Sequence, residues 1–145
     1  MLDLALAVGH HLLIFALFGV LTAELILVRR GMTPEAVARV GKIDLWYGIL
    51  AGLIIAVGFS RAVFAAKGWT YYSHNALFWA KIATFLLIGL LSLPPTVAYI
   101  RWRRAGETPT PPEIARLRRL LVAETALFLL LPVFAAAMAR GYGAF

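Results

Sequence analysis

Four long apolar stretches constrain the fold of this chain more than any other feature. They cover roughly residues 4–28, 45–66, 76–100 and 120–139, and each reaches the roughly 20 residues that a helix needs to cross about 30 Å of hydrocarbon. A backbone in lipid must satisfy its hydrogen bonds within the segment, so each stretch is predicted to be helical. Because 62% of the 145 residues are hydrophobic, a soluble domain of this size could not bury so much apolar surface. We therefore predict an all-α fold, an integral membrane four-helix bundle that forms one domain over residues 1–145.

Two of these helices are entered through short basic segments that precede the apolar stretch. Thr33-Pro34-Glu35 and Thr110-Pro111-Pro112-Glu113 each combine an N-cap threonine, a proline in the first turn and an early acid, which is typical of a helix start. Pro94-Pro95 can break the third helix, and Pro132 is expected to kink the fourth. The predicted helices cover about residues 4–28, 43–66, 76–100 and 113–140.

The basic residues are concentrated in two of the three connections between the helices. The formal net charge is +7, and the first and third connections carry Arg29, Arg30, Arg39, Lys42, Arg101, Arg103, Arg104, Arg116, Arg118 and Arg119. The second connection offers only Lys67 near its start. Under the positive-inside rule, loops 1–2 and 3–4 are predicted to be cytoplasmic, with both termini outside. This distribution indicates contact with the lipid bilayer and its anionic headgroups, not with nucleic acid.

Ionisable residues inside the apolar stretches are the main functional candidates, because such groups are costly in lipid. By depth they form two layers. The outer layer is basic and contains His10, His11, Arg61, Lys81 and Arg140, with His74 in the outer loop. The inner layer is acidic and contains Glu24, Asp44 and Glu124. In the alternative interpretation, the outer cations extend to the headgroups and the inner acids pair with nearby arginines.

The two adjacent histidines point about 100° apart on a helix, so only one of them can face the bundle fully. His10 lies 14 residues before Glu24, at nearly the same angular position, so His10 faces inward if Glu24 does. Neutral imidazole is a common metal ligand, which makes His10, His11 and His74 candidate metal ligands.

Imidazole is also an axial ligand of haem iron, and haem b needs apolar walls and cations for its propionates. The outer layer offers all of these, with Arg61, Lys81 and Arg140 as candidate propionate partners. The chain contains no cysteine, which excludes disulfides, iron–sulfur clusters and thiolate metal sites. Copper(I) fits less well, because it prefers thiolates and thioethers and because Met32 and Met138 are predicted at opposite membrane faces.

Three short segments resemble a known group of proteins. His11-Leu12-Leu13, Trp79-Ala80-Lys81-Ile82 and the run from Arg119 through Glu124 are similar to segments of the HemJ-like protoporphyrinogen oxidases. The whole chain resembles a family of four-helix bacterial membrane proteins related distantly to these oxidases and to the CopD-like copper-resistance proteins. The resemblance implies a multi-pass protein of the bacterial inner membrane that binds haem b through a histidine of the first helix.

The resemblance also implies oxidoreductase activity on a quinone or porphyrin, with Lys81 and Glu124 assisting the chemistry. It favours His11 as the axial ligand, whereas the helical-face argument favours His10, so both stay candidates. Two other functions remain open. The stacked charged layers could line the path of an ion or small-anion transporter or channel subunit, which would require a homo-oligomer because four helices form a thin conduit. The chain could also be a non-catalytic accessory membrane subunit.

Overall fold

The computed structural model describes residues 1–64 and 68–145, and it is all-helical over nearly all of them. Four segments of the described chain are long and apolar enough to cross a membrane. These four candidate spans agree with the four-helix membrane bundle that the sequence predicts. The predicted end of the second helix at residue 66, and Lys67, lie outside the described residues. The elements in chain order are α1 (Leu2–Leu27), α2 (Pro34–Phe64), α3 (Gly68–Ser73), α4 (Ala76–Ala105), α5 (Pro111–Phe128) and α6 (Leu130–Ala139).

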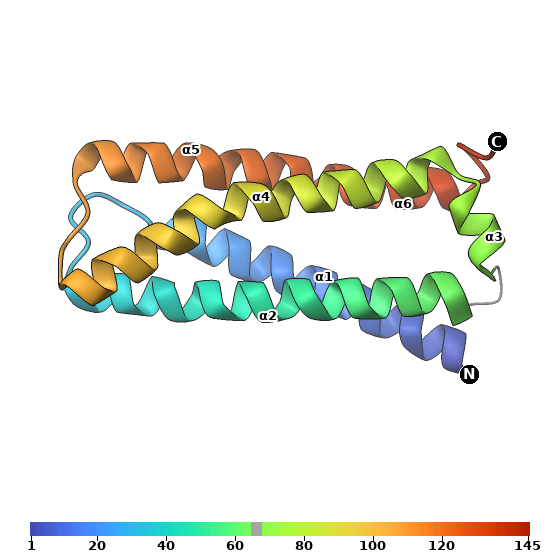
Figure 1. The fold of residues 1–145 in the computed structure, drawn as a ribbon, viewed down its shortest axis with the longest axis horizontal. Helices are drawn as coiled ribbons and strands as arrows, with labels where there is room; N and C mark the ends of the chain where they lie inside the picture. The colour runs from blue at the N-terminus through green and yellow to red at the C-terminus, as the bar shows by residue number, and fades with distance from the viewer. Residues whose placement is uncertain (65–67) are drawn as a thin grey trace.

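The helices form an elongated bundle with chemically different ends (Figure 1). The α1–α2 and α4–α5 connections meet at one end, which we call the arginine end because both connections carry arginines. Both termini and the short helix α3 lie at the other end, the termini end. The two basic connections therefore share one side, as predicted. That this side is cytoplasmic stays a prediction from the positive-inside rule.

The long helices do not all contact one another. Within the described ranges, the backbone of α1 comes close to α2 and α5 but not to α4 or α6. Helix α4 packs against α2, α5 and α6. Where α1 meets the end of α5, the ring centroids of Phe18 and Phe128 are 5.3 Å apart. Toward the termini end, α1 continues beside α2 while α6 continues beside α4, so that α1 and α6 are apart there (Figure 1).

The helix starts follow the capping signals in the sequence. Helix α2 begins at Pro34, well before residue 43, and the backbone N–H of Ala36 donates to the hydroxyl of Thr33 at 3.2 Å. At the start of α5, the N–H and hydroxyl of Thr110 both donate to the carboxylate of Glu113, at 2.9 and 2.7 Å. Both predicted caps are confirmed.

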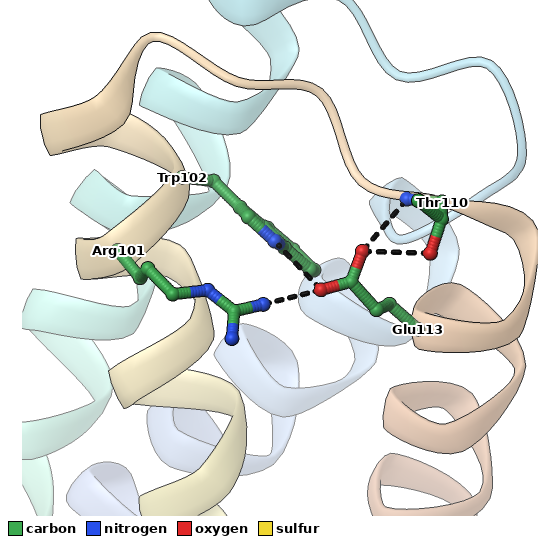
Figure 2. Close-up of polar contacts among 4 residues, drawn as sticks. All are labelled: Arg101, Trp102, Thr110 and Glu113. Carbon is green, nitrogen blue, oxygen red and sulfur yellow. Dashed lines mark hydrogen bonds and ion pairs between the residues drawn. The ribbon is translucent and has the colours of Figure 1, made fainter.

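Glu113 also ties the start of α5 to the end of α4. Arg101 forms an ion pair with its Oε1, and the indole N–H of Trp102 donates to the same oxygen at 3.4 Å (Figure 2). The carboxylate thus accepts from α4 through one oxygen and from its own N-cap through the other. This arrangement closes the arginine end of the α4–α5 pair.

The prolines act differently from one another. Helix α4 continues through Pro94 and Pro95, so the predicted break is wrong: each proline removes only one backbone donor, and the packed turns on both sides keep the helix intact. Pro132 does interrupt the fourth helix, as predicted. Its missing N–H would have bonded the carbonyl of Phe128, where α5 ends, and α6 begins two residues later at Leu130.

The C-terminal tail is bonded to the start of α4 at the termini end. Asn75 caps α4 by accepting from the N–H groups of Leu77 and Phe78 at 2.9 and 3.3 Å. Its own side-chain amide donates to the carbonyl of Tyr142 at 3.0 Å, and the N–H of Ala76 donates to the carbonyl of Gly143 at 2.7 Å. These bonds hold α4 and the end of α6 together.

Candidate functional site

A basic cluster, made of His10, Arg61 and Lys81, lies in the termini half of the bundle. The three side chains come from α1, α2 and α4, and those of Lys81 and Arg61 lie close enough to His10 for their charges to act on its ring. His10 is 9% exposed. Its ring lies against Gly58 of α2, where an added Cβ would be 3.2 Å from Cε1 and 3.7 Å from Nδ1. The glycine therefore gives the imidazole its place between the helices.

The basic cluster has polar atoms that the described protein leaves without partners. Nδ1 of His10 and Nε of Arg61 are both buried and make no hydrogen bond. Lys81 lies over the ring of Phe78, with Nζ 5.7 Å from the centroid, which is a cation–π contact. In residues 1–64 and 68–145 the one salt bridge is Arg101–Glu113 at the arginine end, so no described carboxylate neutralises the cluster.

The other predicted ligands of the termini half lie elsewhere. His11 is exposed on the outer face of α1, with Nδ1 2.7 Å from the carbonyl oxygen of Ala7. His74 is exposed after α3, and Arg140 is exposed at the end of α6. The structure therefore places His10, and not His11, inside the bundle, and it does not bring His74 or Arg140 to the cluster.

The described structure does not bring the three histidines together. Among the residues that the structure describes, no three His, Asp or Glu side chains are close enough to hold a metal ion. His10 and His11 face different directions, with ring centroids 6.4 Å apart and planes at 86°.

An acidic cluster lies deeper toward the arginine end. It consists of Glu24 on α1, Asp44 on α2 and Glu124 on α5, with Tyr47 of α2 and Tyr99 of α4. All five residues are buried, and the carboxyl groups of Asp44 and Glu124 act electrostatically on Glu24. His10 and Glu24 are 14 residues apart on α1, or about 21 Å of helix, so the two clusters occupy different depths.

Within the described residues, two side-chain hydrogen bonds of ordinary length involve the acids of this cluster. The hydroxyl of Tyr47 donates to Oε2 of Glu124 at 3.4 Å, and the hydroxyl of Thr96 donates to Oδ1 of Asp44 at 2.7 Å. Sequence reasoning did not single out Tyr47 or Thr96. A usable signal was the spacing of Tyr47, which lies three residues after Asp44 and so shares its helix face.

The arginines near the acidic cluster bond to other groups. Arg118 of α5 donates to the carbonyl oxygens of Leu25 and Val28, at 2.8 and 2.6 Å, and thereby caps the C-terminus of α1. The boundary salt bridges considered for Glu24 and Glu124 are not found among the described residues. These acids therefore lie in the bundle interior without a countercharge there.

Lys81 and Glu124, both predicted to assist chemistry, belong to different clusters. Lys81 precedes Tyr99 by 18 residues on α4, which corresponds to about 27 Å of helix. Tyr99 in turn lies in the acidic cluster with Glu124. The geometry separates the two residues into a basic and an acidic compartment of one bundle.

The comparison with known families matches almost the whole chain. The family model described as "Predicted membrane protein (DUF2214)" matches residues 2–143, which include all four apolar segments and both clusters. No curated protein and no solved structure matches the chain. The resemblance to HemJ-like and CopD-like proteins therefore stays a prediction. By this match, the chain belongs to the DUF2214 family of predicted membrane proteins.

Proposed function

We propose that this protein is a haem-b-binding redox protein of the bacterial inner membrane, in which His10 would hold the haem. The observation that carries the proposal is the buried imidazole of His10, whose Nδ1 has no partner and which lies beside Arg61 and Lys81. An unpaired polar group is costly inside a membrane protein unless a ligand satisfies it. Imidazole nitrogen is an established protein ligand of haem iron.

The residues around His10 fit the chemistry of haem b. Its two propionates need cations, and Arg61 and Lys81 have no carboxylate partner among the described residues. Nε of Arg61 is buried and unbonded, so it has a donor to offer. Ala62, Phe78 and Met138 are buried apolar residues of the same half of the bundle and supply apolar surroundings. When bound, haem supplies one-electron chemistry, for which a quinone or porphyrin is the proposed partner.

The chain's own residues have separate tasks in this proposal. His10 holds the group in the apolar interior, and Gly58 leaves space for the imidazole ring. Arg61 and Lys81 bind carboxylates, and Lys81 can also hold or release a proton next to them. Aromatic and aliphatic side chains exclude water from the termini half, where Ala62, Phe78 and Met138 form a small buried core.

An absorption spectrum of the full chain, purified in detergent from haem-replete cells, tests the proposal. We expect a Soret band that is lost in His10→Ala and kept in His11→Ala, since His11 faces outward beside it. Arg61→Gln and Lys81→Met should lower haem occupancy, whereas Arg140→Gln, at an exposed position, should not. A colourless protein, both as purified and after haem is added, would refute the haem assignment.

The same basic cluster supports a second candidate, a small-anion transporter or channel subunit. Two cations without a described carboxylate partner attract any small anion that reaches them. Such a path needs a homo-oligomer, because four helices enclose little space. Anion flux into proteoliposomes that is lost in Lys81→Met but kept in Arg140→Gln, with no haem bound, would select this function over the first.

A further inference from the structure

The acidic cluster is not used by the proposed function, and it has unusual features of its own. Glu24 is 2% exposed, Glu124 is 1% exposed and Asp44 is 8% exposed, and they reach the interior from three different helices. Three carboxyl groups in one apolar interior repel one another when they are all ionised, because the medium screens little. They can therefore share this interior only if a cation, or protons on the carboxyl groups, neutralise most of their charge.

The protein supplies no such charge within the described residues. Arg118 is bonded to two backbone carbonyls at the end of α1, and Arg103 extends over Gly41, with a terminal nitrogen 3.8 Å from where a Cβ would be. The side chains that face the carboxyl groups from α2 and α4 are neutral: Tyr47, Tyr99 and Thr96. The missing positive charge must come from a bound species.

A second observation is independent of the acids themselves. The hydroxyl of Tyr99 lies next to the carboxyl group of Glu24, and the residue is 1% exposed, yet no acceptor meets the distance and angle of an ordinary hydrogen bond to this hydroxyl. One carboxyl oxygen each of Glu24 and Glu124 is also buried without a partner. Two carboxyl oxygens are therefore present without a donor, and a proton on either carboxyl group would supply one.

The geometry also selects the kind of cation. No three acids or histidines among the described residues are close enough to coordinate a metal ion. A proton needs no such cage, because a single carboxyl oxygen binds it and a neighbouring oxygen accepts the resulting hydrogen bond. Chains of buried acids in membrane proteins are typical of proton relays.

We propose that the acidic cluster is an exchangeable proton-binding site in the arginine half of the bundle. Glu24, Asp44 and Glu124 hold the protons, and Tyr47 and Tyr99 complete their hydrogen bonds. Asp44 is the least buried of the three acids and is held by Thr96, so protons enter and leave through it. The site goes beyond the proposed redox function, since it requires neither haem nor the basic cluster.

Infrared spectroscopy of the purified full chain in lipid tests this proposal. We expect a C=O stretching band of protonated carboxylic acid in neutral buffer that shifts in D₂O, because the protons exchange. Glu24→Gln and Glu124→Gln should each reduce this band, and the double variant should lose most of it. Glu107→Gln, at an exposed position in the α4–α5 connection, is the matched control and should keep the full band.

A measurement on the unmodified protein guards against variants that fail to fold. A membrane-permeant carbodiimide reacts with protonated carboxyl groups in apolar surroundings, so mass spectrometry should find an adduct on Glu24 or Glu124 and none on Glu107. The absence of both the band and the adduct would overturn the proposal. Loss of the band on adding sodium at fixed pH would also overturn it, because it would show a metal cation in place of the protons.

Discussion

Replacing Gly58 by alanine tests the contact that positions the basic cluster. The added Cβ would lie 3.2 Å from Cε1 of His10, whereas carbon atoms pack best at about 3.5–4.0 Å, so the ring or a helix must shift by a few tenths of an ångström. Alanine is otherwise better than glycine in a helix by up to about 1 kcal/mol. Overpacking costs about 1–3 kcal/mol. We therefore expect Gly58→Ala to lower the free energy of unfolding by up to about 2 kcal/mol.

Gly52→Ala is the matched control, because Gly52 lies on the same helix with nothing within 4 Å of an added Cβ. It should leave the free energy of unfolding unchanged or raise it. The assay is equilibrium unfolding in mixed detergent micelles, followed by circular dichroism. Adding His10→Ala removes the clash, so a double-mutant cycle should give a coupling on the order of 1 kcal/mol between residues 10 and 58. If Gly58→Ala stabilises as much as the control and shows no coupling, the imidazole does not lie against Gly58.

Three further predictions concern the arginine end and the orientation. Glu113→Ala should lower the free energy of unfolding by about 1–2 kcal/mol, because the N-cap of α5 and the tether to α4 are both lost, whereas Glu107→Ala should have little effect in the same assay. Arg118→Ala should lower the free energy of unfolding by about 1–3 kcal/mol, because two carbonyls at the end of α1 lose their donor. Arg119→Ala is the control and should have little effect, because Arg119 is exposed and makes no such bonds among the described residues. The chain has no cysteine, so an impermeant maleimide on intact cells should label His74→Cys and spare Glu107→Cys; the opposite pattern would invert the orientation.

The long helices could be predicted because a single property, hydropathy, sets each of them over some twenty residues. The two polar layers could also be predicted, because position along a spanning helix fixes depth: His10 and Lys81 are near one end, and Glu24 and Glu124 near the other. The 14-residue spacing predicted that His10 faces inward if Glu24 does, and both residues are buried. Each of these inferences uses the sequence of a single helix.

The contacts between helices could not be predicted in the same way. Tyr47 meets Glu124 across 77 residues, and Thr96 meets Asp44 across 52, so both bonds depend on how the helices rotate against one another. Pro94-Pro95 was expected to break a helix because the local rule ignores the packing that holds α4 together. The short helix α3 has too few residues to show a periodicity.

The bonds of the C-terminal tail determine which parts of the termini end can separate. Asn75 and Ala76 attach the beginning of α4 to Tyr142 and Gly143, so α4 and α6 must move as one body. Among the described residues, the backbone of α1 comes close to neither α4 nor α6. Separating α1 from the α4–α6 body would therefore break none of the tail's hydrogen bonds.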